Sequence, residues 1–119
     1  MTEVTEVKRP ARLPSEILSD GLWFQRAMAK DAHGDEVDAD SAGAVGWCLI
    51  GACIAAHHSK TPEGFYAAVH EAASRLESHR GSKYDSIAHM LIRWNDSPGR
   101  TKDEVVGVLR EAEARYYEI

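Results

Sequence analysis

No residue from Ala42 to Ala56 is charged, and this stretch mixes Ala, Gly and Cys with larger apolar residues. As a helix it would span about 22 Å, less than the roughly 30 Å core of a bilayer. Its apolar side chains would point in nearly all directions around the axis, which requires neighbours on most sides. The pattern therefore predicts a buried central helix over residues 41–58.

The ends of this central helix and its glycines carry local signals. Asp40 or Ser41 is the expected N-cap, and Pro62 lies just beyond the polar end of the segment. Gly46 and Gly51 would each cost about 1 kcal/mol of helix propensity relative to Ala. Such a cost is acceptable where another backbone must come close, so we expect close approaches at both glycines.

Four other segments show helical patterns. A short helix is expected over residues 14–20, because Pro14 suits a first helical position and Gly21 an end. The next runs from an N-cap at residue 61 to a stop before residue 81, and another follows a cap at residue 85 or 86. The last begins with the capping box formed by Thr101 and Glu104. The fold class predicted is mainly α, with four to five helices packed around residues 41–58.

The segment over residues 22–38 allows two interpretations. Alternation of side chains over residues 22–30 fits a strand, whereas Ala27, Met28 and Ala29 would also suit a continued first helix. We favour a small β-hairpin at about 22–38, with a turn at residues 31–34 that places Gly34 in the left-handed region. Residues 1–12 are expected to be a mobile arm, and residues 13–119 a single helical domain.

Composition narrows the classes of function. The chain has 119 residues and a formal charge of −5 from 19 acidic and 14 scattered basic residues, which disfavours nucleic-acid binding. The amino terminus lacks the apolar segment of a secretory signal, so a cytoplasmic location is expected and no membrane partner. Cys48 and Cys53 would diverge on one helix, so no disulfide is expected.

Two motifs carry a resemblance. The stretch WCLIGA covers Trp47–Ala52, and the stretch WNDSPGRTKDEV covers Trp94–Val105. With them the chain resembles a family of short uncharacterised bacterial and phage proteins, over about residues 23–112. The family has no assigned activity, so the resemblance supports the boundaries of the elements and implies no reaction.

The candidate ligand site lies at the turn before the last helix. Asn95, Asp96, Arg100 and Thr101 could form a polar pocket for an anion, because free N–H groups at the helix start and the guanidinium would point the same way. The competing interpretation is that the same side chains only cap and brace the turn. Turn chemistry alone favours this second interpretation.

Catalytic chemistry could be built on Cys48, with a histidine as base and Asn95 or Asp96 as the group that orients it. We expect instead a structural thiol in the middle of a helix, because reactive cysteines prefer a helix N-terminus or an electropositive cleft. Trp23 and Trp47 are expected to belong to the core or to a partner-binding surface.

Metal binding has one local pair, Cys53 and His57. The candidates that could complete it are His58, His70 and His89, but no standard metal motif is present, so neither a metal nor another cofactor is expected. The acidic segment over residues 31–40 lacks the glycine and glutamate positions of a calcium loop.

These observations predict a small non-enzymatic binding or regulatory protein of the bacterial or phage cytoplasm. Its partner would be a protein or a small anionic ligand, and a homodimer could form through Tyr116, Tyr117 and Ile119. The alternative is a small hydrolase-like enzyme that uses Cys48 with a histidine, or the Asn95, Asp96 and Arg100 cluster.

Overall fold

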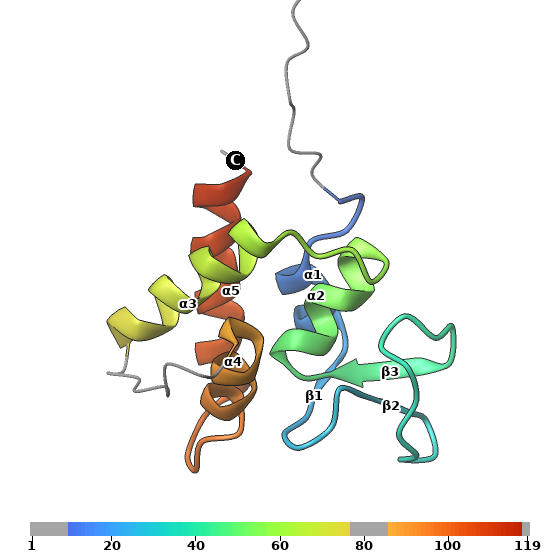
Figure 1. Ribbon diagram of the computed structural model, residues 1–119. Coiled ribbons are helices and arrows are strands. Elements are labelled where there is room, and N and C mark those ends of the chain that lie inside the picture. The colour runs from blue at the N-terminus through green and yellow to red at the C-terminus, as the bar shows by residue number, and fades with distance from the viewer. Residues whose placement is uncertain (1–9, 77–85, 118–119) are drawn as a thin grey trace, which may run out of the picture.

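A computed structural model describes residues 10–76 and 86–117, and within them the chain forms five helices and a three-stranded sheet (Figure 1). The predicted mainly α class is confirmed. The sheet lies at one end of α2, and α3, α4 and α5 lie on the other side of that helix (Figure 1). The elements, in chain order, are α1 (Pro14–Asp20), β1 (Leu22–Trp23), β2 (Ala29–Asp31), β3 (Ala44–Trp47), α2 (Leu49–His57), α3 (Glu63–Leu76), α4 (Ile87–Asn95) and α5 (Lys102–Tyr116).

The helix starts follow the sequence closely. The first helix has the predicted bounds, and Ser86 caps α4 by accepting a hydrogen bond from the backbone N–H of His89 at 3.1 Å. The predicted capping box of Thr101 and Glu104 is present at the start of α5. Most of the predicted mobile arm, residues 1–9, and the predicted end of the third helical segment lie outside the described residues.

The predicted bounds of the central helix are wrong at its start. Residues 41–43 are not helical, Ala44–Trp47 is a strand, and the N-cap of α2 is Cys48 in place of Asp40 or Ser41. The reason is tertiary: β3 lies between β1, to which it is parallel, and β2, to which it is antiparallel. Its backbone groups pair on both sides, which outweighs local helix propensity.

The two glycines of this region do make the close approaches that the sequence predicts. A Cβ on Gly46 would lie 2.3 Å from Cε2 of Phe24, and a Cβ on Gly51 would lie 1.9 Å from the carbonyl oxygen of Met28. Neither position can hold a larger residue unless its surroundings move. These contacts press the segment after β1 against β3 and against the first turn of α2.

The hairpin turn is confirmed, although its pairing differs. Gly34 has a positive φ of 84°, and its N–H donates to the carbonyl oxygen of Asp31 at 3.0 Å. The return segment forms a single bridge between Lys30 and Glu36, whereas the main partner of β2 is β3. The loop beyond is fastened by Trp47, whose indole N–H donates to the carbonyl oxygen of Ala39 at 2.8 Å.

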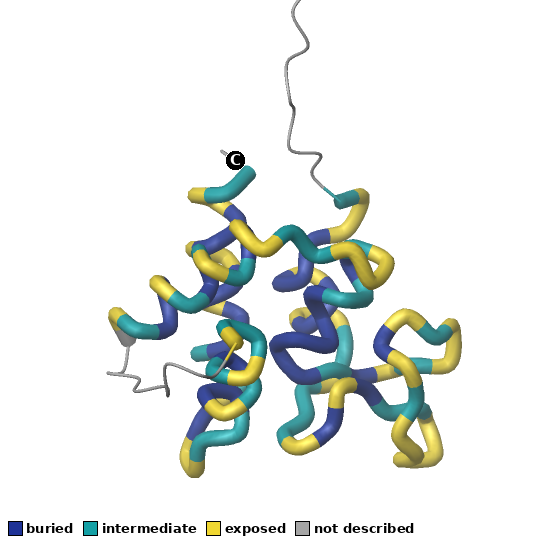
Figure 2. The backbone as a smooth tube through the Cα atoms, viewed as in Figure 1, coloured by how far each residue is buried: buried dark blue, intermediate teal, exposed yellow. Residues whose placement is uncertain are grey.

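The core is shared by the helices. Figure 2 shows most of α2 buried and the tip of the hairpin exposed. The helices α3 and α5 face each other with small and branched side chains, and α2 packs against α1 and α4. The start of α2 and the end of α4 therefore meet next to the sheet, and this junction holds the candidate site.

Candidate functional site

Asn95, at the end of α4, is the polar centre of this junction and is completely buried. Its side-chain oxygen accepts the indole N–H of Trp23 at 2.7 Å and the backbone N–H of Leu49 at 3.1 Å. Its amide nitrogen donates to the carbonyl oxygen of Phe24 at 3.2 Å and to Asp96 Oδ1 at 3.0 Å. All four hydrogen-bonding positions of the amide are thus used within the chain.

The bonds of Asn95 join three parts of the fold that are far apart in sequence: the end of β1, the start of α2 and the end of α4. Gln25 adds to this connection, because its amide nitrogen donates to the carbonyl oxygens of Asn95 and Ser97, both at 3.0 Å. A buried polar group with every bond satisfied gives a junction a single geometry. Asn95 therefore positions the site, and its amide has no capacity left for a ligand.

Asp96, from the predicted ligand site, lines a pocket. The pocket has a volume of about 230 Å³ and lies between the 26–28 segment, the start of α2 and α4. Asp96 Oδ1 accepts the backbone N–H of Arg26 at 2.9 Å. Arg26 has a positive φ of 65°, a conformation that a residue with a side chain rarely adopts, and its own side chain is exposed. The pocket is lined by Arg26, Ala27, Met28, Glu36, Cys48, Ile92 and Asp96.

Cys48 forms one wall of this pocket, and its position corrects the expectation of a thiol in the middle of a helix. It is the N-cap of α2, where its sulfur accepts the backbone N–H of Gly51 at 3.3 Å and lies 3.9 Å from the sulfur of Met28. Burial nevertheless raises the pKa of the Cys48 thiol, against the opposing effect of the N–H groups, and the nearby Asp96 carboxylate raises it further. The side chain is 4% exposed. The Cys48 thiol is therefore kept protonated and largely excluded from solvent.

Arg100 and Thr101 are engaged in the turn and in the first turn of α5. The Arg100 guanidinium lies over the Trp94 ring at 3.8 Å, its Nε donates to the carbonyl oxygen of Trp94 at 2.9 Å, and Nη1 lies 3.6 Å from Glu104 Oε1. The Thr101 hydroxyl accepts the backbone N–H of Glu104. The structure thus brings together Asn95 and Asp96 with the sheet, while Arg100 and Thr101 face the start of α5.

The candidate metal pair is occupied by contacts within the chain. Both ring nitrogens of His57 have partners: Nδ1 lies 2.8 Å from the carbonyl oxygen of Cys53, and Nε2 is hydrogen-bonded to the Tyr117 hydroxyl. Burial lowers the pKa of His57 and raises the pKa of Tyr117 to about 12. In the part of the chain that the structure describes, no three His, Cys, Asp or Glu side chains gather as metal ligands.

The pocket also contains residues that sequence reasoning missed. These residues are Arg26, Met28 and Ile92, to which the sequence assigns no role. Arg26 and Met28 approach Cys48 and Asp96 only because β3 is a strand that pairs with β1 and β2, whereas the sequence predicts a helix there. The uncharged stretch around Gly46 and Gly51 was the available signal, because it predicted close backbone contacts without identifying the partner segments.

Comparison with known proteins identifies one relationship. A family model with the description "Family of unknown function (DUF6197)" matches residues 5–115. No curated protein and no solved structure gives a significant match. Within the described residues, no helix is both long and apolar enough to cross a membrane.

Proposed function

The chain belongs to the family of unknown function DUF6197, and we propose that it is a small non-enzymatic binding protein whose protein partner inserts a side chain into the pocket beside Asp96. The observation that carries this proposal is the construction of the pocket. Asn95, beside the pocket, is buried and fully hydrogen-bonded, and its bonds tie the end of α4 to the end of β1 and to the start of α2. A preorganised pocket binds at a lower entropic cost than one that must be formed.

A protein partner is supported better than the small anionic ligand that the sequence also suggested. The anion would need Arg100, but its guanidinium is stacked on Trp94 and the residue is only 8% exposed. The lining of the pocket is instead a mixture of apolar atoms from Met28 and Ile92 with the carboxylates of Glu36 and Asp96. Such a surface suits a long side chain with an apolar stem.

A binding role also agrees with the state of Cys48. A thiol must ionise to attack a substrate, and burial raises the pKa of this one. Its sulfur bonds to Gly51 N–H and contacts the sulfur of Met28, and no described histidine is hydrogen-bonded to it. We assign Cys48 the role of an apolar wall.

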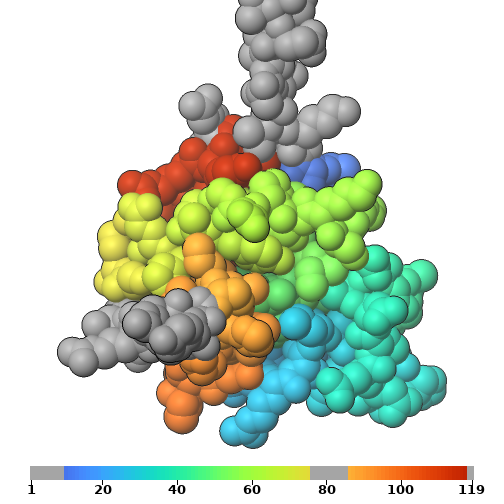
Figure 3. Space-filling model, in the orientation of Figure 1, coloured from blue at the N-terminus to red at the C-terminus, as the bar shows by residue number. Residues whose placement is uncertain are grey.

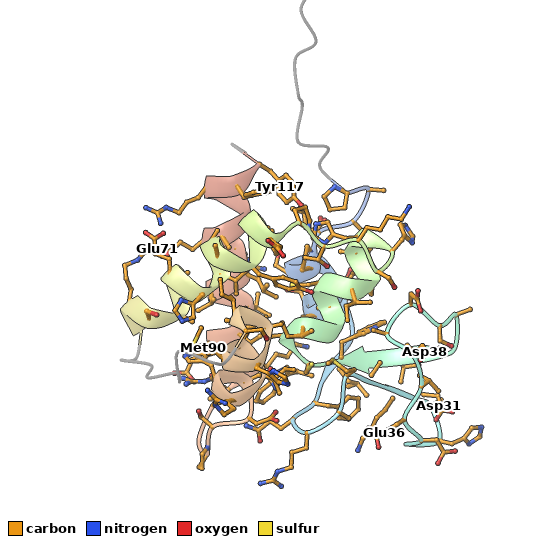
Figure 4. All side chains as sticks on the ribbon, in the orientation of Figure 1. Asp31, Glu36, Asp38, Glu71, Met90 and Tyr117 are labelled. Atoms are coloured by element: carbon orange, nitrogen blue, oxygen red, sulfur yellow. The ribbon has the colours of Figure 1, made fainter. Side chains whose placement is uncertain are left out.

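Methyl groups of methionine give a direct test of the pocket. Met28 lines the pocket. Met90 lies on α4 (Figure 4) and is not among the lining residues. Three short capped peptides serve as probes, in which leucine alternates with lysine, with glutamine or with glutamate. We expect at least one of them to shift the ¹³C-methyl signal of Met28 in the NMR spectrum and to leave the signal of Met90 in place. The signals are assigned with Met28→Leu and Met90→Leu. Equal shifts at both methyl groups, or none with any peptide, would contradict the proposal.

The second candidate is a small hydrolase-like enzyme, and the observation in its favour is that Cys48 is the N-cap of α2 and lines a pocket next to Asp96. Free N–H groups at a helix start do favour a thiolate. The candidate is tested by hydrolysis of an activated ester such as p-nitrophenyl acetate. The binding proposal expects equal rates for the protein and for Cys48→Ser, and a rate that falls at least about tenfold in the variant would support the enzyme.

The cellular setting that we propose is the cytoplasm of a bacterium or of a phage-infected cell. Both cysteines are free and buried, which is common in proteins of reducing compartments. No homodimer is part of the proposal, because Tyr116 and Tyr117 already pack against Phe65 within the chain.

A further inference from the structure

A second hollow adjoins the pocket beside Asp96. Its volume is about 500 Å³, and it is lined by Met28, Glu36, Val37, Asp38, Ala39, Asp40, Ile54 and Ser59. The two hollows share Met28 and Glu36 and therefore adjoin each other, and we call the surface that they make up between the hairpin, α2 and α4 the groove. Figure 3 shows the hairpin side of this region in cyan and teal, next to α4 in orange.

The lining of the groove includes apolar side chains, among them Met28, which both hollows share. Met28 is 38% exposed where the two hollows adjoin, and among the described residues it is one of three large apolar side chains that are exposed. Ile92 and Cys48 line one hollow, and Ile54 and Val37 line the other. Exposed apolar surface inside a polar rim is typical of a binding groove.

The rim is strongly acidic. The lining of the groove includes four carboxylates and one guanidinium, that of Arg26. Figure 4 shows Asp31, Glu36 and Asp38 gathered on the hairpin, on the side of the molecule opposite Glu71. The carboxylates that line the groove are Glu36, Asp38, Asp40 and Asp96.

Two of these carboxylates are not neutralised by the rest of the described chain. Among residues 10–76 and 86–117, the ion pairs involve neither Glu36 nor Asp38. By contrast, the carboxylate of Glu71 on the helical side is paired with Arg75 and Arg115. Negative charge is therefore left available along the groove, where it can attract a cation.

We propose that the groove binds a basic segment of a partner protein, in which lysine or arginine side chains alternate with apolar ones. The apolar residues lie on Met28, and the cationic ends reach Glu36 and Asp38. Charge complementarity selects this occupant, because an acidic segment would meet four carboxylates. The inference rests on the proposed function and adds the chemistry of the partner to it.

The test compares variants of equal net charge with the alternating lysine and leucine peptide. Glu36→Gln combined with Asp38→Asn removes two charges from the groove, and Asp35→Asn combined with Asp103→Asn removes two charges from residues that do not line it. Affinity is measured from the Met28 methyl shift at low and at physiological salt. We expect the groove variant to bind roughly threefold more weakly per carboxylate removed, and its affinity to depend less on salt. The control should bind as the unmodified protein does.

Four results would overturn the inference, and they bear differently on the binding role. Equal weakening in the control would show that only net charge matters. A Met28 shift with the glutamine or glutamate peptide but not with the lysine peptide would remove the basic partner and leave the pocket as a binding site. A Met28 shift that depends on protein concentration without peptide would identify a second copy as the occupant. A lack of response to all three peptides would remove both proposals together.

Discussion

The sheet half of the molecule, residues 22–48, and the helical half, α3 with α5, are held in place in different ways. The helical half is joined by a continuous surface of buried side chains such as Phe65, Val69 and Leu109. The sheet half has strands of two to four residues and depends on a few atoms at Gly46, Gly51 and Asn95. A contact spread over many side chains tolerates substitution, whereas a point contact, made by one or two residues, does not. The pocket lies where the point contacts are, so its geometry is exact and its residues are difficult to replace.

The largest effect is expected for Gly51→Ala. The new Cβ would lie 1.9 Å from the Met28 carbonyl oxygen, so α2 and the 26–28 segment must separate. We expect a loss of about 4 kcal/mol in the free energy of unfolding, measured by urea denaturation. The matched control is Gly107→Ala in α5, where nothing lies within 4 Å of the new Cβ. The control should gain about 0.5 to 1 kcal/mol, and similar losses in both variants would remove the contrast between the halves.

Asn95→Ala should have the next largest effect. It leaves the indole N–H of Trp23, the N–H of Leu49 and the carbonyl oxygen of Phe24 without their partner. We expect a loss of about 3 kcal/mol, because each buried unpaired group is costly. Trp23 fluorescence and urea denaturation together measure it. A loss under about 1 kcal/mol would mean that water replaces the amide and that the junction is not held by this residue.

Phe65→Leu is the corresponding test of the helical half. The Phe65 side chain is completely buried and packs against Tyr116 and Tyr117. Because an apolar side chain remains, we expect a loss of only about 1.5 kcal/mol in the free energy of unfolding. Phe65→Leu and Asn95→Ala are compared by thermal and urea denaturation. A larger loss for Phe65→Leu than for Asn95→Ala would reverse the order of the two halves.

Glu113 is a point contact within the helices, and its effect should be the smallest. Its buried carboxylate accepts the backbone N–H of Ser15 at 2.8 Å and the hydroxyl at 2.5 Å, and burial raises the pKa of Glu113. A raised pKa gives a contribution to stability that is complete below the unfolded pKa and is lost as the pH rises through the folded pKa. The native protein should therefore gain stability relative to Glu113→Gln when the pH falls from 7 to about 5. A difference that is constant with pH, or that moves in the other direction, would contradict this.

The sequence anticipated the helices because their signals are local. The capping box of Thr101 and Glu104, the cap at Ser86 and the Pro14 start all depend on residues within one turn. The strand over Ala44–Trp47 could not be recognised, because its stability comes from β1 and β2 on either side and not from its own residues. The same is true of the site: Asn95 and Asp96 were visible as turn residues, but Arg26 and Met28 reach them through that unrecognised strand.

The most direct test of the account concerns Cys48, which we regard as an apolar wall of a preformed pocket. The rate of its alkylation by iodoacetamide at neutral pH is measured in the folded protein and in urea, and mass spectrometry identifies the modified cysteine. The side chain is 4% exposed and burial raises the pKa of its thiol, so we expect the folded protein to react at least about tenfold more slowly than the unfolded chain. Equal rates would show a wet, ionisable thiol and would favour the enzyme over the binding protein.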